Sequence, residues 1–229
     1  MNYLKIFLLF TVCLTGCNSG SQSEKENEEE KSQEMKRSEE FVTIDPKEIY
    51  GNPIRMIGEE WMLITAGNQE SYNTMTAGWG TLGLIWGKPV ATCYIHPDRY
   101  TFEFMEKNEY YTLCFFDEEY KAALTYCGTE SGRDHKEKNK AEAAGLTPLY
   151  TENGNVYFKE AYLVLECRKL YSAPFKSENF ATNIVTLRRD GTESVYNEMP
   201  QFHKFYIGEI VKSQVRHLVG ADMVSLKSN

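Results

Sequence analysis

The feature that most constrains the fold is a series of short runs rich in β-branched and aromatic residues, each bounded by glycine or charged residues. These runs span residues 61–66, 89–95, 110–116, 157–171, 182–188 and 204–215. Such runs are typical of β-strands, and strands of this number and spacing favour a closed antiparallel barrel. We therefore expect a mostly β fold.

Three segments between these runs have the pattern of helices, namely residues 101–107, 118–127 and 136–144. Gly128 and Gly145 follow two of them, and glycine is common where helices end. We therefore expect both glycines to be C-caps, and we expect the helices to flank the barrel.

The N-terminus has the pattern of a lipoprotein signal. Lys5 precedes an apolar run over residues 6–14, which ends in Leu14-Thr15-Gly16-Cys17. A charged start, a short apolar region and small residues before a cysteine predict removal of residues 1–16 and lipidation of Cys17. A membrane-spanning anchor is the alternative, but that needs about 20 apolar residues. The expected location is the cell envelope, lipid-anchored to a membrane outside the cytoplasm.

Residues 17–40 predict an acidic tether. After Cys17, this segment holds eight Glu against four Lys and Arg, with no aromatic or branched aliphatic residue. So polar a segment cannot bury enough apolar surface to offset the entropy lost on ordering. Residues 41–229 are then expected to form one domain with a sizeable core.

Charge and cysteine usage exclude some functions. The net charge of −8 argues against nucleic acid as a partner. No metal-type spacing, Walker A motif or GxSxG motif occurs, which removes metal, nucleotidase and hydrolase interpretations. The domain's cysteines are Cys93, Cys114, Cys127 and Cys167. Buried free thiols are favoured, since most of them lie in apolar strand-like runs, although an exported protein could form disulfides.

Residues 73–86, NTMTAGWGTLGLIW, are interpreted as a binding loop. Gly78 and its neighbouring glycines allow close approach of a flat ligand, Thr74 and Thr76 offer hydroxyl groups, and Trp79 and Trp86 offer aromatic faces. The alternative is that both tryptophans are core residues and the glycines serve turns.

Arg99 is a candidate phosphate ligand. Its guanidinium can donate to two oxygens of an oxyanion, and the Arg99-Tyr100-Thr101 sequence precedes a predicted helix, whose free N–H groups attract phosphate. The alternative is a surface ion pair with Asp98 or Glu103.

Several segments together resemble the flavin reductase-like family of FMN-binding split barrels, particularly its flavoredoxin branch. The likeness spans about residues 50–215 and rests on five short motifs in order: WMLITAGN at 61–68, NTMTAGWG at 73–80, RYT at 99–101, SGRD at 131–134 and HKFYIGEI at 203–210. The resemblance implies an antiparallel Greek-key split barrel, FMN as the cofactor, and a homodimer with FMN in a groove between subunits.

The resemblance also implies the residues that contact the cofactor. They are Asn73, Thr74, Met75, Thr76, Ala77, Gly78, Trp79, Arg99, Tyr100, Thr101, Ser131, Gly132, Lys136 and Lys138. Either of the two lysines could match the family's lysine. His203 resembles a histidine near the nicotinamide site of flavin reductases and is the candidate catalytic residue. Phe202 replaces the acidic residue that many relatives have before this histidine.

Three functions are consistent with these features. The first is an FMN enzyme that takes hydride from NAD(P)H, which has no obvious supply outside the cytoplasm. The second is a flavoredoxin-like carrier that exchanges electrons with a redox partner protein near the membrane, where a tether raises the partner's effective concentration. The third is a surface lipoprotein that binds a ligand without redox chemistry.

Overall fold

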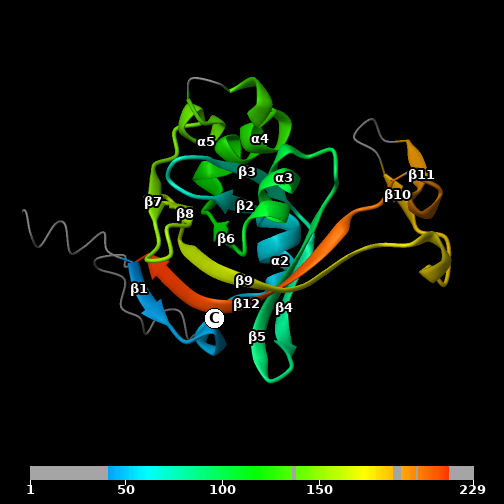
Figure 1. Ribbon diagram of the computed structural model, residues 1–229, viewed down its shortest axis with the longest axis horizontal. Coiled ribbons are helices and arrows are strands. Elements are labelled where there is room, and N and C mark those ends of the chain that lie inside the picture. The colour runs from blue at the N-terminus through cyan, green and yellow to red at the C-terminus, as the bar shows by residue number, and fades with distance from the viewer. Residues whose placement is uncertain (1–40, 136–137, 188–191, 200, 217–229) are drawn as a thin grey trace, which may run out of the picture. The chain divides into compact units, whose positions relative to one another are not determined.

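The computed structural model describes residues 41–135, 138–187, 192–199 and 201–216 (Figure 1). The predicted signal, Cys17, the tether and Lys136 therefore lie outside the described residues. Among the residues that are described, no helix is long and apolar enough to cross a membrane.

One large antiparallel sheet organises the domain. Its strands lie in the order β3-β2-β6-β9-β12-β5-β4, and β1 pairs with β12. Their bounds are β1 Phe41–Ile44, β2 Met62–Gly67, β3 Tyr72–Ala77, β4 Gly80–Ile85, β5 Lys88–Ile95, β6 Tyr110–Phe115, β9 Leu163–Pro174 and β12 Lys204–Arg216. Two small antiparallel pairs are not hydrogen-bonded to the large sheet as strands, and they are formed by β7 Pro148–Tyr150 with β8 Val156–Phe158 and by β10 Val185–Leu187 with β11 Glu193–Val195.

Short helices connect the strands. The α-helices are α2 Pro53–Arg55, α3 Tyr100–Lys107, α4 Lys121–Thr129 and α5 Lys140–Ala143. A π-helix, η2, covers Met56–Glu60, and the 3-10 turns are η1 Pro46–Glu48, η3 Glu118–Tyr120, η4 Gly132–Asp134, η5 Ser177–Asn179 and η6 Tyr196–Glu198. Helices α3 and α4 pack against β2 and β3, in the upper half of Figure 1.

Strand β2 shows why the sheet is buried on both faces. Its alternate residues Met62 and Ile64 belong to the core enclosed by the curved sheet, whereas Leu63 belongs to the apolar cluster under α4. Successive side chains of a strand point to opposite faces, so a strand covered on both sides needs apolar residues at nearly every position. The MLITAG sequence of β2 meets that requirement, since all six of its residues are buried.

The mostly β prediction is confirmed, and the predicted runs at 61–66, 89–95, 110–116 and 204–215 match β2, β5, β6 and β12. The run at 157–171 is divided between β8 and β9. The N–H of Lys159 donates to the carbonyl of Thr147, and β8 ends at Phe158 instead of continuing into β9. In the described residues no pairing joins β3 to β4, so the sheet is open rather than closed.

Two local predictions were wrong. Residues 73–86 are not one loop: β3 pairs along its whole length with β2, and β4 covers Gly80–Ile85. Gly128 lies inside α4 and is not its cap, whereas Gly145, with a φ of +89°, follows α5 as expected. Only the second glycine takes the left-handed conformation that favours glycine.

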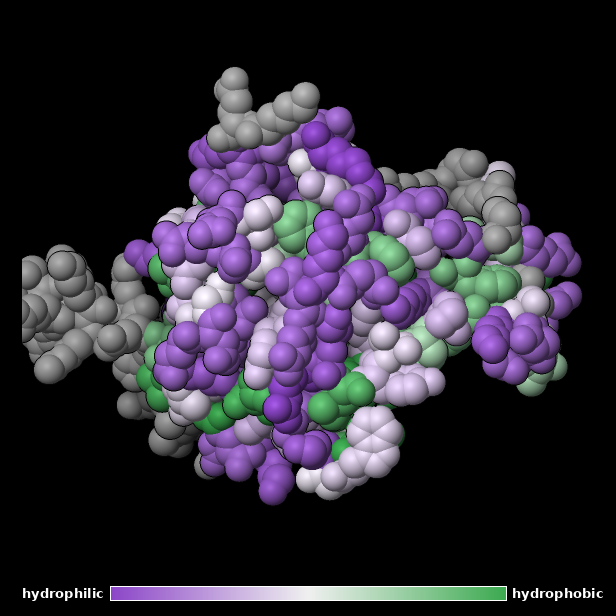
Figure 2. Space-filling view, viewed as in Figure 1, coloured by the Kyte–Doolittle hydropathy of each residue, from purple (hydrophilic) through white to green (hydrophobic). Residues whose placement is uncertain are grey.

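The two tryptophans are not core residues. Trp79 is 53% exposed, and Trp86 is 62% exposed at the turn of the β4–β5 hairpin. Trp86 and Gly87 both have positive φ, 53° and 71°, which matches the right-handed twist of a two-residue hairpin. Figure 2 shows this hairpin end as a weakly polar to apolar area below a largely hydrophilic face.

The cysteines Cys93, Cys114, Cys127 and Cys167 are all buried free thiols, as favoured from the sequence. Burial raises the pKa of Cys93 and of Cys114 to about 12. These thiols are protonated at neutral pH and are therefore poor nucleophiles.

Candidate functional site

Asn73 joins three elements that are distant in sequence. Its side chain is buried, and Nδ2 donates to Oγ1 of Thr101 at 2.7 Å and to the carbonyl of Thr74 at 3.2 Å. Gly132, in η4, lies against it: a Cβ there would overlap Oδ1 of Asn73 and approach Cδ1 of Tyr100 to 3.0 Å. We call Asn73, Tyr100, Thr101 and Gly132 the Asn73 cluster.

Turn η4 is held to helix α3 by Arg133. Its Nη2 lies 2.5 Å from Oε1 of Glu103, and its guanidinium stacks 4.7 Å from the ring of Tyr100. Ser131 begins the turn, because its Oγ accepts from the N–H of Arg133. The predicted residues Ser131 and Gly132 are thus brought beside Tyr100 and Thr101.

Arg99 is exposed at the start of α3, and its Nη1 donates to the carbonyl of Gly128 at 3.2 Å. Neither alternative ion pair forms, because Glu103 is paired with Arg133 and Asp98 lies 3.4 Å from Nδ1 of His96. Within the described residues, no carboxylate forms an ion pair with Arg99.

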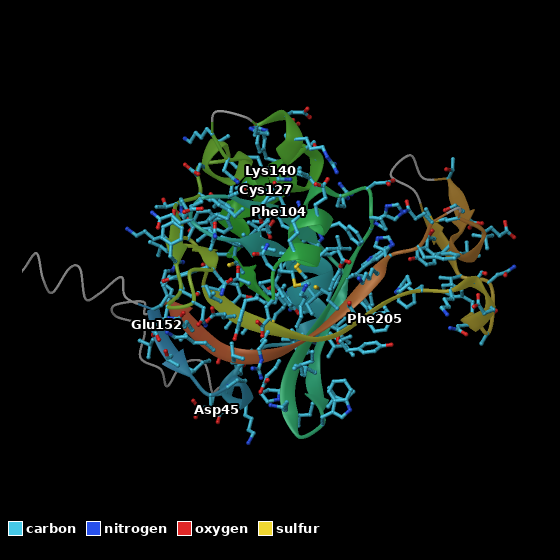
Figure 3. All side chains as sticks on the ribbon, viewed as in Figure 1. Asp45, Phe104, Cys127, Lys140, Glu152 and Phe205 are labelled. Carbon is cyan, nitrogen blue, oxygen red and sulfur yellow. The ribbon has the colours of Figure 1, made fainter. Side chains whose placement is uncertain are left out.

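Lys140 is a candidate residue that sequence reasoning missed. It is 4% exposed, and Nζ donates to the carbonyls of Cys127 at 2.7 Å and Glu130 at 2.8 Å (Figure 3). Its pKa is lowered to about 8, mainly by burial, and the charge of Arg99 also lowers it. Two cations therefore lie near the end of α4, which favours binding of an anion there.

A local signal marks Lys140. Oδ1 of Asn139 accepts from the N–H of Ala141, so Asn139 is the N-cap and α5 begins at Lys140. Asparagine is a preferred N-cap, whereas the predicted helix began at residue 136. Lys138, one of the two predicted lysines, is exposed.

The hydroxyl groups of β3 are already bonded inside the protein. Thr74 is fully buried, with Oγ1 bonded to Oγ1 of Thr65 at 2.9 Å, and Thr76 donates to the carbonyl of Leu124. Met75 and Ala77 belong to the core. The interpretation of the threonine hydroxyls as free ligand donors was therefore wrong. As an edge strand of the sheet, β3 can still offer backbone groups on its outer side.

Gly78 and Trp79 connect β3 to β4. A Cβ at Gly78 would lie 3.1 Å from the ring of Trp61, so the chain passes that indole closely. Trp79 then turns outward, and its ring lies 5.0 Å from that of His203 and 6.4 Å from that of Tyr196.

His203 lies among other rings just before β12. Its Nδ1 is 2.8 Å from the hydroxyl of Tyr196, and its ring is 5.1 Å from that of His96. We call Trp79, His96, Tyr196 and His203 the His203 cluster.

The pKa of His203 is lowered to about 4, first by burial and then by the neighbouring His96 and Arg99. The imidazole is therefore neutral at pH 7. A neutral imidazole donates one hydrogen bond and accepts another, but unlike an imidazolium it is not a proton donor for acid catalysis.

Arg99 acts electrostatically on both parts of the site, since its charge lowers the pKa values of Lys140 and His203.

A broad hollow of about 820 Å³, lined by residues between Ile49 and Met56 with Glu60 and Tyr162, shares no residue with either cluster. Among the described residues, no group of His, Cys, Asp or Glu could hold a metal ion.

The sequence matches the family described as "Flavin reductase like domain" over residues 54–223. No curated protein matches the chain. An FMN-binding domain of a flavin reductases-like enzyme from Shewanella baltica is similar in structure, with 15% identity, 77% of this chain and 78% of that chain covered, and a TM-score of 0.53.

Two further solved structures are more distant by TM-score. Flavoredoxin from Methanosarcina acetivorans is 21% identical, with 67% of each chain covered and a TM-score of 0.49. An NADH:FAD oxidoreductase from Streptomyces globisporus, solved with NAD and FAD fragments, is 12% identical, with 68% of this chain and 74% of that chain covered and a TM-score of 0.49. The likeness to the Shewanella domain agrees with the expected split-barrel fold.

Proposed function

Because the chain belongs to the family of flavin reductase like domains, we propose that it is an FMN-binding flavoprotein that transfers hydride or electrons through the bound cofactor. The single observation that carries the proposal is Arg99. It is an exposed guanidinium without a carboxylate partner among the described residues, at the start of α3 and beside Lys140.

The cofactor phosphate is assigned to Arg99 and the first turn of α3. The first N–H groups of a helix lack partners within the helix and attract anions, and an arginine adds charge-assisted hydrogen bonds. Lys140 binds the carbonyls of Cys127 and Glu130, so it fixes the end of α4 on which Arg99 rests and adds positive charge. Lys140 joins Lys136 and Lys138 as a candidate lysine in our assignment.

The flavin ring is assigned to the outer edge of β3 and to Trp79. Backbone groups of residues 73–78 suit the polar edge of the ring, and the exposed indole of Trp79 offers a flat face. When bound, FMN supplies the ability to accept and release hydride or single electrons. The protein binds it, orients it and stabilises the charge of its reduced form.

His203 is assigned a place beside the second reactant. Since its pKa is about 4, the imidazole provides a neutral hydrogen-bonding group at pH 7 rather than a proton donor. Phe202, in place of an acidic residue, removes one charge that would raise that pKa.

The electron donor is either NAD(P)H or a redox partner protein. Mixing the FMN-loaded protein with NADH or NADPH under anaerobic conditions distinguishes the two. Rapid bleaching of the flavin absorbance indicates a reductase that uses NAD(P)H, whereas no bleaching favours an electron carrier.

We also propose lipidation at Cys17, a membrane-anchored location outside the cytoplasm and a homodimer. The signal pattern of residues 1–17 supports the first two, and the family membership supports the third. Cys17→Ser should remove a lipid label and release the protein from membranes. A monomeric mass in sedimentation would contradict the dimer.

Titration with FMN tests the assignment of the phosphate. Arg99→Ala should weaken binding by about 10–100-fold, the usual loss for a hydrogen bond to a charged group. Arg55→Ala is the matched control, because Arg55 is an exposed arginine paired with Glu59 away from both clusters. Equal affinities of the two variants would contradict the assignment. Wild-type protein without flavin affinity would favour a ligand-binding lipoprotein without redox chemistry.

A further inference from the structure

Tyr196 is linked to His203 by two hydrogen bonds. Its hydroxyl lies 2.8 Å from Nδ1 of His203 and accepts from the backbone N–H of the same residue at 3.2 Å. Tyr196 comes from turn η6, in the segment between β9 and β12 that carries the small β10–β11 pair at the right of Figure 1.

Aromatic packing fixes the tyrosine ring. Tyr196 is buried, and its ring lies 5.9 Å from that of Phe180 and 5.8 Å from that of Phe202. Its backbone N–H also donates to the carbonyl of Ile184 at 2.7 Å. The hydroxyl is therefore held in place against His203.

Counting protons determines the direction of the bond to Nδ1. The tyrosine oxygen already accepts from the backbone N–H, and its own single proton has no other partner within the described part of the chain. If Nδ1 carried the imidazole proton, the hydroxyl would accept twice and leave its own proton unused, which is costly in a buried group. If the hydroxyl donates, its proton and Nδ1 are both used, and only Nε2 is left for a further partner.

We infer that Tyr196 is a positioning residue: its hydroxyl donates to Nδ1 and holds the neutral imidazole of His203 in the tautomer that carries its proton on Nε2. The second nitrogen of the ring is then a hydrogen-bond donor. The tautomer of a histidine is set in this way by the bond that its other nitrogen makes.

The surroundings of His203 agree with a neutral donor. Besides Tyr196, the groups whose charge acts on it are His96 and Arg99, with Asp98 bound to His96 rather than to His203. No carboxylate forms an ion pair with His203 in the described ranges, so no acidic group there stabilises an imidazolium.

This donor specifies a class of ligand, an inference that rests on the proposed function. The imidazole ring of His203 lies 5.0 Å from the exposed ring of Trp79, and an Nε2–H donor on a ring next to an aromatic face suits a flat reactant with an acceptor oxygen, such as a carbonyl, carboxamide or carboxylate. A reactant without such an oxygen would leave the donor without a partner and should bind less well.

Nitrogen-detected NMR of protein labelled with ¹⁵N-histidine tests the tautomer without any flavin. The chain has four histidines, and His203→Gln identifies the signal of residue 203. At pH 7 we expect wild-type His203 to show a protonated Nε2 and an unprotonated Nδ1. A protonated Nδ1 in the wild-type protein would overturn the inference.

Tyr196→Phe tests the cause. It keeps the aromatic ring and removes the donor, so we expect signals from both tautomers. Tyr94→Phe is the matched control: its ring lies 5.7 Å from that of Phe175 in the same aromatic region, and it should leave the His203 signals unchanged. An unchanged single tautomer in folded Tyr196→Phe would also overturn the inference.

Kinetics then test the ligand class. If the protein turns over a reactant with an acceptor oxygen, Tyr196→Phe should raise its KM by about 3–10-fold, the range expected for one neutral hydrogen bond. An unchanged KM beside a changed tautomer would reject the ligand class while leaving the positioning role intact. Failure to bind FMN would reject the proposed function and not the tautomer.

Discussion

The Asn73 cluster and the His203 cluster hold their side chains in different ways. Asn73 and Thr101 are buried and joined by a 2.7 Å hydrogen bond, and Gly132 leaves no room for another atom. Apart from the hydrogen bonds between Tyr196 and His203, the His203 cluster is built from ring contacts of 5.0–6.4 Å, and it includes the half-exposed Trp79. Small changes should therefore unfold the first cluster, whereas the second should tolerate them and change in ligand binding.

The largest effect is expected from Gly132→Ala. The added Cβ overlaps Oδ1 of Asn73, so β3 and η4 must move apart, and the free energy of unfolding should fall by about 3 kcal/mol. Urea denaturation measures the change. Gly83→Ala is the control, because nothing lies within 4 Å of a Cβ there. Equal stability of the two variants would refute tight packing at η4.

Asn73→Ala should cost about 2 kcal/mol, because it leaves a buried Thr101 hydroxyl with no donor to its oxygen. The same denaturation experiment applies. Asn68→Ala removes an exposed amide that bonds only within its own turn and should cost less. A loss as small as that of Asn68→Ala would mean that Asn73 is not the link between β3 and α3.

Acid should affect the His203 cluster in a defined pH window. The folded pKa of His203 is about 4, below the ordinary value of 6.5, so between these values the unfolded chain binds a proton that the folded protein does not. The free energy of unfolding should therefore fall as pH falls from 6.5 to 4, by about 2 kcal/mol after allowance for partial exposure.

His203→Gln should flatten that part of the pH profile. Glu209 does not interfere, since hydrogen bonds from Lys88 and Arg168 lower its pKa below 4.5 and its contribution is lost only in stronger acid. A profile that is the same in the variant and the wild type would show that His203 is not the group that titrates.

The smallest effect is expected outside both clusters, at Trp86. This residue has a φ of +53° in a two-residue turn before Gly87, a position that asparagine occupies more easily. Trp86→Asn should raise the melting temperature slightly, corresponding to about 0.5 kcal/mol. A clear loss of stability would indicate that Trp86 has a packing role.

The strands that bury apolar residues could be predicted from the sequence. Elements and residues whose structure depends on contacts with distant segments could not. Strand β2 is apolar enough to be recognised by itself, but the YNTMTA sequence of β3 has weaker strand propensity and is fixed by pairing with β2, as at Thr74 and Thr65. Lys140 was missed because its importance depends on carbonyls of α4, which no sequence pattern locates.

Part of the site could be predicted from the order of the short motifs along the chain. Asn73, Thr101 and Gly132 were all predicted as contact residues, and the fold brings them together. The Tyr196–His203 bond was not predicted, because the two residues come together through the aromatic packing of the segment between β9 and β12. Whether these residues contact a cofactor stays a prediction.

The most direct test of the account is the absorption spectrum of the purified protein after incubation with FMN and removal of free flavin by gel filtration. We expect flavin absorbance to elute with the wild-type protein and to be largely lost from Arg99→Ala. Wild-type protein that elutes without flavin, while circular dichroism shows it to be folded, would contradict the central claim that this site binds FMN.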